Sequence, residues 1–410
     1  MHNKLIEDST TIFIRGAGFD QCVYSGENSS SGNSFILVKG MLNVCHLISG
    51  DLWAGAEVMA YNLLKGLSRL KDLSLSTIIF NEGKLAAAVR NLGIPVDLVD
   101  EGKLSFLSAL KATRKIILEK QVNILHSHRY KENILGYLAS SGMKQMSLIS
   151  TQHGMPSWSW LRDLKNVAIQ RTNFLVLSKR FQTTVAVSKD IKDRLARGYG
   201  FPGKKIVVIH NGIELPEAQL SHSGKDPFTV GSAGRLFPEK GYSLFVELAK
   251  EVVKKKPEIR FLLAGEGPER GKIEDLIRDF GLEGNFCLLG FVDDTSAFYR
   301  ELDLYVNTSL HEGIPMSVLE AMSHGLPVIA PNVGGFHEII DEGVQGCLVL
   351  RRDPEEFADR ILRLFENNEL RERMSSGAKE KIAREFALDR VSQEYHQLYM
   401  EIFSRNCGFH

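Results

Sequence analysis

A junction between a loop and a helix decides the fold of this chain, and it lies at residues 309–330, SLHEGIPMSVLEAMSHGLPVIA. Pro315 can begin a helix, because its missing N–H would have had no partner in the first turn. Residues from Val318 continue at helical spacing until Gly325 ends them. Glu312 in the loop and Glu320 in the helix therefore belong to one site.

This junction suits a ligand that carries both a negative charge and hydroxyl groups. A helix N-terminus presents free backbone N–H groups and the positive end of the helix dipole, which favour a phosphate. Glu320, in the first turns of the helix, can accept hydrogen bonds from hydroxyl groups. Phosphate and polyol together indicate a nucleotide-sugar.

Length and composition indicate a globular chain of two or three domains, with 410 residues, 43% hydrophobic and 24% charged. The five cysteines are scattered without a C-x-x-C pair, which indicates neither a disulfide framework nor a zinc site. A reducing compartment, the cytoplasm, fits best. No apolar run has the length of a membrane span, and the N-terminus lacks the basic start and apolar core of a signal peptide.

The two halves of the chain differ in charge, although the total is zero. Residues 41–215 hold 24 Lys and Arg against 13 Asp and Glu, whereas residues 216–410 hold 23 against 33. Such a basic half predicts an acidic partner, either a phospholipid surface or a lipid-linked phosphate, with no nucleic acid expected. An ordinary charge difference between two domains is the alternative.

The most basic segment of that half lies beside large apolar side chains. Residues 162–205 hold 11 basic against 3 acidic side chains. The neighbouring apolar residues are Trp158, Trp160, Leu161 and Phe174. Cations with interfacial aromatics predict a peripheral contact with the inner face of an anionic membrane, while a solvated basic face explains the charges alone.

The pattern of the chain predicts an α/β fold with two Rossmann-like domains that face each other across a cleft. Residues 1–40 lack a strong periodicity, and we expect an extension, either poorly ordered or an overlong start assignment. Strands and helices then alternate twice, over residues 41–215 and 216–386, with a polar linker near residues 217–227. Apolar positions in residues 387–410 predict a helix that crosses back to the N-terminal domain.

Runs typical of strands and helices support this division. In the first half we expect strands at 41–48, 75–80, 96–99, 123–126, 147–151, 184–187 and 206–209, and helices at 56–70, 104–119, 132–140 and 189–197. In the second half we expect strands at 228–233, 259–264, 285–289, 304–307, 327–330 and 346–350, and helices at 242–255, 270–280, 354–366 and 370–384. Parallel sheets of this kind bind ligands at the carboxyl ends of their strands.

A basic turn follows the first strand of the second half, in the stretch GRLFPEKG at residues 234–241. Arg235 and Lys240 could hold a diphosphate between them and neutralise it as a leaving group. The alternative is a solvated basic turn before a helix. Because Glu312 and Glu320 lie in the same half, the diphosphate interpretation is favoured.

These motifs resemble those of glycosyltransferase family 4, the retaining GT-B enzymes known as glycosyl transferases group 1. The similarity rests on G-R-x4-K-G at 234–241, E-G-x-P-x4-E-A-M-x2-G-x-P-V at 312–328, and three shorter stretches. The shorter stretches are AGEGP at 264–268, LGFVD at 289–293 and GG at 334–335 before Glu338. The match covers about residues 41–403, and it implies transfer of a sugar from a nucleotide-diphosphate-sugar, expected to be a UDP-sugar.

The resemblance also implies a role for each residue of the donor site. Arg235 and Lys240 would bind the diphosphate, Glu320 the ribose hydroxyls and Glu312 the donor sugar. Backbone N–H groups of Met316, Ser317, Val318 and Leu319 would hold phosphate or sugar oxygens. The loop at 290–292, with Phe291 and Val292, would touch the base. The expected acceptor is a glycan or a polyprenyl-diphosphate-linked sugar, in cell-surface polysaccharide or glycolipid synthesis.

In the N-terminal half the resemblance is looser. The stretch AGAE at 54–57 lies where the family has G-G-x-E, and Gly55 would let the donor phosphates come close, with a plain helix start as the alternative. The resemblance assigns His153 to the donor sugar and the reacting centre. His128 is then a residue of the acceptor side or a support for the site, and His126 a hydrogen-bonded core histidine.

Metal binding is the rival interpretation of these histidines, but no carboxylate or cysteine stands near them at ligand spacing. The chain has no Asp-x-Asp motif for a divalent ion. We therefore expect catalysis without a metal or other cofactor, with Arg235 and Lys240 supplying the positive charge.

Three other functions remain open from the sequence. A nucleotide-sugar epimerase or hydrolase would share the fold and differ in needing no acceptor. A catalytically idle sugar-nucleotide-binding subunit would bind nucleotide without turnover. A dehydrogenase fits least, because the first strand is not followed by G-x-G-x-x-G.

Overall fold

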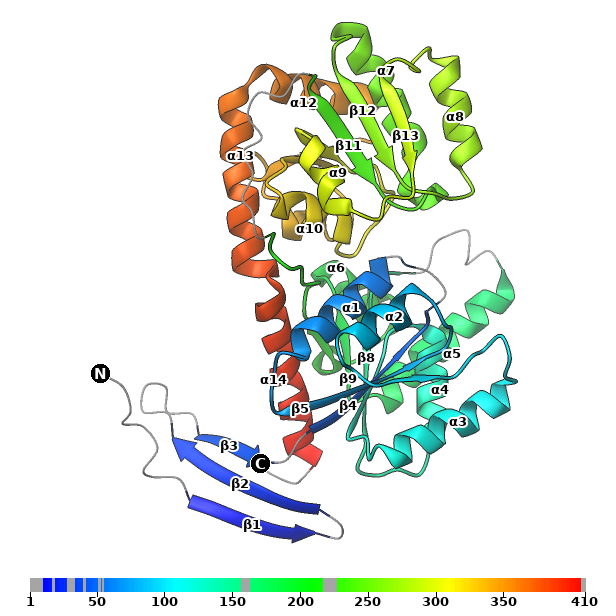
Figure 1. Cartoon of the computed structure of the whole chain (residues 1–410), viewed down its shortest axis with the longest axis vertical. Helices are drawn as coiled ribbons and strands as arrows, with labels where there is room; N and C mark the ends of the chain where they lie inside the picture. The colour runs from blue at the N-terminus through cyan, green and yellow to red at the C-terminus, as the bar shows by residue number, and fades with distance from the viewer. Residues whose placement is uncertain are drawn as a thin grey trace.

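The computed structural model describes residues 10–16, 19–27, 34–39, 42–50, 53, 55–155, 163–216 and 227–406, with side chains from residue 42 onward. Its elements form two α/β domains, one above the other in Figure 1, joined along one side by the helices α13 and α14. Trp158, Trp160 and Leu161, expected at a membrane surface, lie outside the described residues.

Residues 10–39 form a three-stranded antiparallel sheet within the part of the extension that is described. This sheet lies apart from the two parallel sheets, beyond the end of α14 (Figure 1). The sequence pattern did not predict strands in this extension. The strands are β1 Thr10–Gly16, β2 Phe19–Glu27 and β3 Ser34–Lys39.

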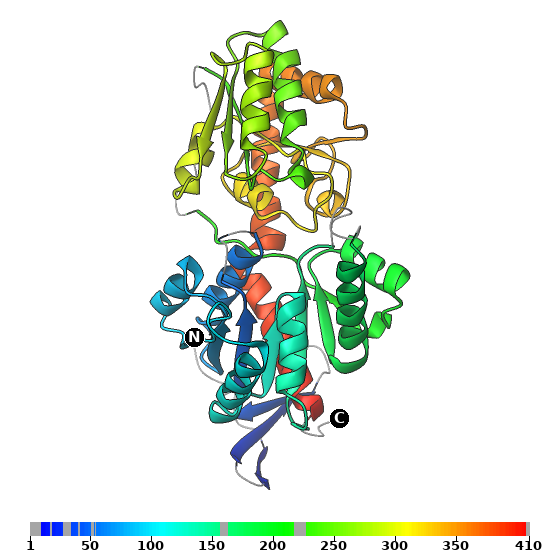
Figure 2. The ribbon, with the colours of Figure 1, turned by 90° about the vertical axis from the view of Figure 1, so that its right-hand side faces the viewer.

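The N-terminal domain is built on a parallel sheet with the strand order β10-β9-β8-β7-β4-β5-β6. Its strands are β4 Leu42–Ile48, β5 Leu73–Ile79, β6 Val96–Leu98, β7 Ile124–Ser127, β8 Ser147–Gln152, β9 Thr183–Ala186 and β10 Ile206–Val208. Its helices are α1 Gly55–Leu67, α2 Lys84–Asn91, α3 Phe106–Glu119, α4 Tyr130–Ala139, α5 Leu164–Arg180 and α6 Lys189–Tyr199. Helices lie on both sides of the sheet (Figure 2), which confirms the predicted fold class.

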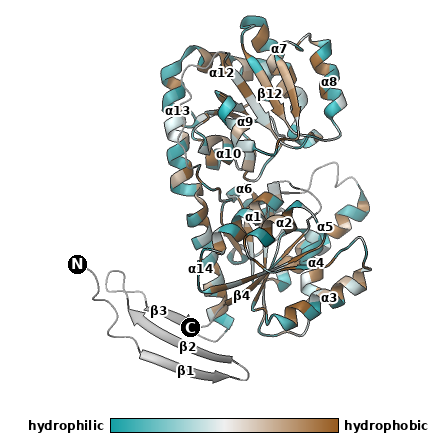
Figure 3. Cartoon of the chain, viewed as in Figure 1, coloured by the Kyte–Doolittle hydropathy of each residue, from teal (hydrophilic) through white to brown (hydrophobic). Residues whose placement is uncertain are grey.

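The C-terminal domain repeats this arrangement with the strand order β13-β12-β11-β14-β15-β16. Its strands are β11 Thr229–Ala233, β12 Arg260–Ala264, β13 Phe286–Gly290, β14 Leu304–Val306, β15 Val328–Pro331 and β16 Gly346–Val349. Its helices are α7 Tyr242–Lys255, α8 Arg270–Asp279, α9 Thr295–Glu301, α10 Met316–Ser323, α11 Phe336–Ile339, α12 Pro354–Glu366 and α13 Asn368–Lys381. In Figure 3, which is coloured by hydropathy, β4 and β12 consist mainly of hydrophobic residues, whereas α13 consists mainly of hydrophilic ones.

Local sequence explains where these helices begin. In α12, Asp353 caps the N-terminus by accepting from the N–H of Glu355, and Pro354 occupies the first turn. The buried side chains Phe357, Ile361 and Leu364 recur at helical spacing and face the core.

The helices α2, α5, α9 and α11 were not predicted from the sequence.

Phe174 corrects one expectation about the membrane-facing segment. Its side chain is buried, with the rings of Tyr199 and Phe201 at 4.2 and 5.6 Å. Phe174 therefore belongs to the core of the domain and is not available to a lipid surface. Among the described residues, no helix has both the length and the apolarity that a membrane span requires.

The chain crosses between the domains at two places that lie side by side. After α13, a π-helical turn at Ile382–Phe386 (η4) leads to α14 Leu388–Asn406, which packs against α1 in the N-terminal domain. Ile213, on the other crossing, donates its N–H to the carbonyl of Phe386 and accepts from the N–H of Leu388, both at 2.9 Å. The predicted crossing helix is thereby present.

Side chains also join the domains near the ends of their strands. The carboxylate oxygens Oε1 and Oε2 of Glu338 accept from the backbone N–H of Lys189 at 2.8 and 2.9 Å, and Oε1 also accepts from the backbone N–H of Asp190 at 3.3 Å. Glu338 thus caps a helix of the other domain. Burial alone would raise the pKa of Glu338, but the hydrogen bond from His210, together with the two backbone N–H donors, holds this pKa below its usual value. Ser188 caps the same helix by accepting from the N–H of Ile191 at 3.1 Å.

Candidate functional site

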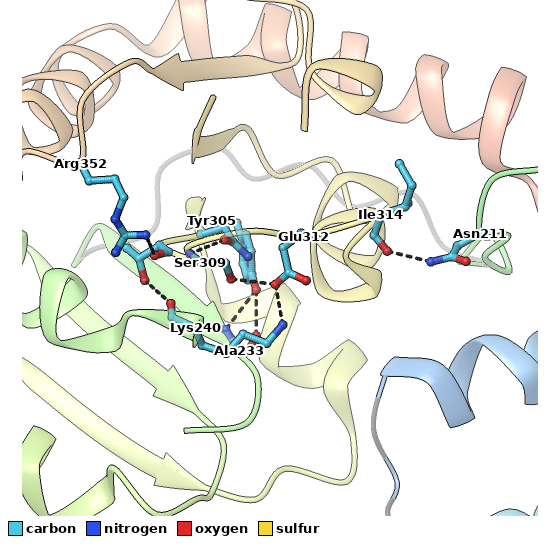
Figure 4. A network of polar contacts seen from close by, with 10 residues as sticks. Asn211, Ala233, Lys240, Tyr305, Ser309, Glu312, Ile314 and Arg352 are labelled. Atoms are coloured by element: carbon cyan, nitrogen blue, oxygen red, sulfur yellow. Dashed lines mark hydrogen bonds and ion pairs between the residues drawn. The ribbon is translucent and has the colours of Figure 1, made fainter. Parts of the chain in front are cut away.

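Lys240 and Glu312 meet at the carboxyl ends of β11 and β14. Their ion pair has a distance of 2.5 Å between Nζ and Oε1, and the hydroxyl of Ser309 donates to the same carboxylate oxygen at 2.7 Å (Figure 4). The side chain of Glu312 is mostly buried, and the side chain of Lys240 is about one-quarter exposed. Lys240 was expected to bind the diphosphate and Glu312 the donor sugar, but in this structure the two side chains contact each other directly.

The backbone holds this pair in place. Thr308 donates its hydroxyl to the carbonyl of Lys240 at 3.0 Å, and Arg352 donates to the carbonyl of Thr308 at 2.8 Å. Gly241 has a φ of +66°, and a Cβ there would lie 2.5 Å from the carbonyl oxygen of Thr308. Only glycine accommodates both the backbone angle and this close approach.

Arg235 lies in the same turn, and its guanidinium group is exposed. The group stands 4.7 Å from the ring centroid of Phe237. The side chain is not packed into the core, so it is accessible to an anionic ligand at the strand end.

The loop that carries Glu312 is held by two glycines of the following strand end. The N–H of Gly335 donates to the carbonyl of Glu312 at 3.1 Å. A Cβ at Gly334 would lie 2.1 Å from that carbonyl oxygen, and a Cβ at Gly335 would lie 1.9 Å from the carbonyl oxygen of Gly313. The glycine pair singled out in the sequence therefore lets two loops lie backbone against backbone.

The helix α10 begins directly after this loop, with Pro315 as its N-cap. The N–H groups of Val318 and Leu319 donate to the carbonyl of Pro315 at 3.1 and 3.3 Å, so they are engaged within the first turn. The first N–H groups of a helix have no acceptor inside it. Met316 and Ser317 are therefore the stronger candidates of the four to hold phosphate oxygens.

Glu320 lies on the same helix and is largely shielded from solvent. Tyr299 donates its hydroxyl to Oε2 of Glu320 at 2.8 Å. Burial raises the pKa of Glu320 to about 7, although the bond from Tyr299 opposes the shift. Near neutral pH this carboxyl group is therefore partly protonated, and a ligand that donates hydrogen bonds to it would stabilise its charged form.

The loop proposed to meet the base follows β13. Phe291 is exposed, and the ammonium group of Lys84, from α2 of the other domain, lies 5.2 Å from its ring centroid. Lys84 also forms an ion pair of 2.6 Å with Asp293. Val292 is half-buried beside Phe291. This loop thus presents an aromatic face near the domain boundary.

Gly55 and His153 come from the N-terminal domain. Gly55 begins α1, and no atom of the described residues outside its own helix and its chain neighbours lies within 4 Å of the position that a Cβ there would take. His153 follows β8, and its carbonyl oxygen would lie 2.8 Å from a Cβ on Gly313. Because Gly313 is next to Glu312, the structure brings His153 and the donor-side loop together across the domain boundary.

The histidines of the N-terminal domain lie in one group. His126 and His128 are buried, and so is His46 on the adjacent strand. Both ring nitrogens of His126 have partners, the hydroxyls of Tyr399 at 2.7 Å and Thr151 at 2.8 Å. This confirms His126 as a hydrogen-bonded core histidine.

His46, His126 and His128 together offer three nitrogens within 4.8 Å of one another, a spacing that could hold a metal ion. However, both ring nitrogens of His126 already have hydrogen-bond partners. Coordination by all three histidines would therefore break one of these two hydrogen bonds.

Two kinds of functional candidate were missed in the sequence. His46 stands in the apolar run of β4, and Tyr395 and Tyr399 are among the apolar positions of α14. The only sign of His46 in the sequence was a polar residue inside an apolar strand. Its neighbours become clear only from the pairing of β4 with β7, which places His46 beside His126. Tyr299 had no sequence signal linking it to Glu320.

Two family models match adjacent parts of the chain. One, described as Glycosyltransferase Family 4, matches residues 53–217, and the other, described as Glycosyl transferases group 1, matches residues 217–381.

Curated relatives extend over most of the chain. An uncharacterized glycosyltransferase of Methanocaldococcus jannaschii is 27% identical over 356 residues, covering 85% of this chain and 95% of the relative. The UDP-Gal:alpha-D-GlcNAc-diphosphoundecaprenol alpha-1,3-galactosyltransferase of Escherichia coli is 24% identical over 376 residues, covering 85% and 96%.

Solved structures show the same fold. Anabaena HepE in complex with UDP-glucose superimposes with a TM-score of 0.78 at 20% identity, covering 88% of this chain and all of HepE.

Proposed function

Because this chain belongs to the glycosyltransferase family 4, or glycosyl transferases group 1, of GT-B fold, we propose that it is a retaining, metal-independent enzyme. It moves a sugar from a UDP-sugar to a hydroxyl group of a glycan or lipid-linked acceptor. One observation carries this proposal. The pair of Lys240 and Glu312 stands at the domain boundary, where His153 of the other domain abuts Gly313.

The donor would lie along the C-terminal domain. The uridine would meet Phe291 and Val292, the ribose Glu320, and the diphosphate Arg235, Lys240 and the N–H groups of Met316 and Ser317. UDP-glucose in Anabaena HepE and the UDP-Gal donor named for the Escherichia coli relative support UDP. Lys240 would exchange its contact with Glu312 for the diphosphate, which leaves Glu312 free to accept from the sugar.

Retention would follow from attack on the face that the leaving group departs from. The bond between the sugar C1 and the diphosphate oxygen breaks as the acceptor oxygen bonds to C1. The proton of the acceptor hydroxyl passes to the departing diphosphate, and Arg235 and Lys240 stabilise the negative charge that develops there. No protein nucleophile is required for this route.

The acceptor would bind to the N-terminal domain. A cavity of about 690 Å³ opens there, lined mainly by apolar side chains that include Phe80, Leu104, Phe106, Tyr130, Ile134 and Ile169. Lys131, Lys165 and Glu101 also line it. Glu101 forms an ion pair of 3.5 Å with Lys131, and Lys165 adds a further cation beside the apolar space. That combination suits an isoprenoid chain with a diphosphate head. The diphosphoundecaprenol acceptor named for the Escherichia coli relative supports this class.

We propose that the enzyme acts in the cytoplasm at the inner face of the membrane. Phe106, Leu107 and Leu164, with exposed fractions of 55%, 66% and 85%, border the same region and would contact lipid. Synthesis of a cell-surface polysaccharide or glycolipid would follow from such an acceptor.

The test is transfer by the purified protein from a panel of UDP-sugars to polyprenyl-diphosphate-sugar acceptors. Release of UDP should depend on the acceptor, and NMR of the product should show the anomeric configuration of the donor. Release of UDP without any acceptor would instead support the epimerase or hydrolase alternative, which the curated relatives do not favour. Tight nucleotide binding without turnover would support an idle binding subunit.

A further inference from the structure

Three imidazole rings form a row through the N-terminal domain, from the core to the domain boundary. Nδ1 of His46 lies 3.0 Å from Nε2 of His128, and Nδ1 of His128 lies 3.2 Å from Nε2 of His153. We refer to His46, His128 and His153 as the imidazole row. His128 lies between the other two rings and contacts each of them through a different ring nitrogen, so the row is a continuous chain of hydrogen bonds.

The rings of the row meet edge to edge. Neighbouring planes differ by only 20° and 22°, and the centroids lie 5.3 and 5.4 Å apart. At these N···N distances the rings share nearly one plane and do not stack face to face. Each proton between two rings can therefore point along the line that joins the nitrogens, as a strong hydrogen bond requires.

All three rings are neutral near pH 7. Burial lowers the pKa of His46 and of His153 to about 3, and the pKa of His128 falls well below its ordinary value for the same reason, aided by its histidine neighbours. A neutral imidazole has one nitrogen that donates and one that accepts. The direction of one bond in the row therefore fixes the direction of the others.

The inner end of the row contacts the crossing helix α14. The hydroxyl of Tyr399 lies 2.7 Å from Nδ1 of His126 and 3.4 Å from Nε2 of His46. A separation of 2.7 Å is typical of an O–H donor, whereas N–H donors are typically longer by about 0.2 Å. The hydroxyl proton of Tyr399 thus points to His126, and its oxygen is left to accept from the N–H at Nε2 of His46.

This direction propagates to the outer end. If Nε2 of His46 carries the proton, Nδ1 of His46 accepts from Nε2 of His128, and Nδ1 of His128 accepts from Nε2 of His153. Nδ1 of His153 is then a bare acceptor, and it is buried without a hydrogen-bond partner in the described part of the chain. A buried nitrogen without a partner destabilises the protein until a ligand supplies a hydrogen bond to it.

We propose that His46, His128 and Tyr399 are positioning residues that hold His153 in the tautomer protonated at Nε2, so that Nδ1 accepts a hydrogen bond from a hydroxyl of the donor sugar. The identity of that ligand rests on the proposed function, whereas the tautomer of His153 does not. The crossing helix would thereby set the hydrogen-bonding character of a residue at the domain boundary.

The experiment combines 15N NMR of histidine-labelled protein with kinetics. Wild-type protein should show Nδ1 of His153 unprotonated and Nε2 protonated. Tyr399→Phe removes the acceptor for Nε2 of His46, so the resonances of His153 should shift toward a mixture of tautomers. Its kcat/KM should fall about tenfold to a hundredfold, as when partners that orient a functional histidine are removed.

Tyr395→Phe is the matched control. Tyr395 lies on the same helix, is equally buried, and contacts Thr151 at 3.1 Å, outside the row. It should leave the tautomer of His153 unchanged. Wild-type His153 protonated at Nδ1, or equal effects of the two variants on its resonances, would overturn the proposal. The predicted tautomers in a protein that shows no glycosyl transfer would uphold the row and reject only the proposed function.

Discussion

Lys240 and Glu312, 72 residues apart in the chain, form an ion pair with 2.5 Å between Nζ and Oε1. The pair is preorganised by Ser309 and by the backbone of the two loops, so its charges occupy fixed positions before a donor binds. A pair held in this way can exchange partners without rebuilding the loop.

Replacing Lys240 by alanine should lower kcat about a hundredfold to a thousandfold, because a preorganised charge on the leaving group would be lost. The measurement is the rate of sugar transfer at saturating donor and acceptor. Lys256→Ala is the control, since Lys256 forms a surface ion pair with Glu366. Equal rates in the two variants would contradict the assigned role of Lys240.

Binding of a UDP-sugar should strengthen as pH rises from 6 to 8. The pKa of Glu320 is about 7 in the free protein, and hydroxyl donors from the ribose would lower it in the complex. Below pH 7 a proton must therefore leave on binding, at a cost of about tenfold in affinity per pH unit, and above pH 7 the affinity should level off.

Calorimetry in buffers of different ionisation enthalpy measures that proton release directly. A UDP-sugar is the suitable probe, because its diphosphate has no titrating group in this range. In Glu320→Gln the pH dependence should disappear. A flat profile in the wild-type protein would rule out Glu320 as the ribose contact.

Gly313→Ala should lower activity strongly, although the backbone at this position needs no positive φ. The new Cβ would lie 2.8 Å from both the carbonyl oxygen of His153 and Cδ1 of Ile191, so the domains could not approach as they do. Gly271→Ala, where a Cβ meets nothing within 4 Å, should leave activity unchanged. Small-angle scattering should show a larger radius of gyration for Gly313→Ala alone.

Filling the apolar cavity should separate long from short acceptors. Ala168→Phe places a ring in its lining, and losing the burial of about two methylene groups costs roughly 1.6 kcal/mol, about tenfold in kcat/KM. A long polyprenyl acceptor should show this loss, and a short alkyl acceptor should not. Leu175→Phe, exposed on the same helix outside the lining, is the control.

Chelation with EDTA should leave transfer unaffected, because Arg235 and Lys240 would supply the positive charge that a divalent ion supplies elsewhere. Activity is measured before and after dialysis against the chelator, with magnesium and zinc added back separately. Loss and recovery with one ion would overturn metal independence and direct attention to the group formed by His46, His126 and His128.

The sequence predicted the two parallel sheets because their strands are short apolar runs between turn residues, as β4 and β11 illustrate. It also predicted that Arg235, Lys240, Glu312 and Glu320 share one half of the chain. It could not predict that Lys240 pairs with Glu312, because that contact depends on β11 and β14 being neighbours. Strand order is a tertiary property, and a periodic pattern in the sequence does not encode it.

The same limit explains the imidazole row. His126, His128 and His153 could be placed at strand ends from local pattern, but His46 joins them only through the pairing of β4 with β7. Tyr399 arrives from a helix 273 residues beyond His126. Apolar spacing in that helix predicted packing, and it gave no indication that two of the packed residues would use their hydroxyl groups.

Ile213 and Ala387, on the two crossings between the domains, form a parallel bridge flanked by hydrogen bonds to Phe386 and Leu388. Two connections fastened at one point act as a pivot, which permits rotation and resists translation. A rotation of the C-terminal domain about this pivot would leave it few other degrees of freedom. Each return along that arc would bring Gly313 back to His153 in the same register, so the proposed donor site, divided between two bodies, would be reassembled the same way at every turnover.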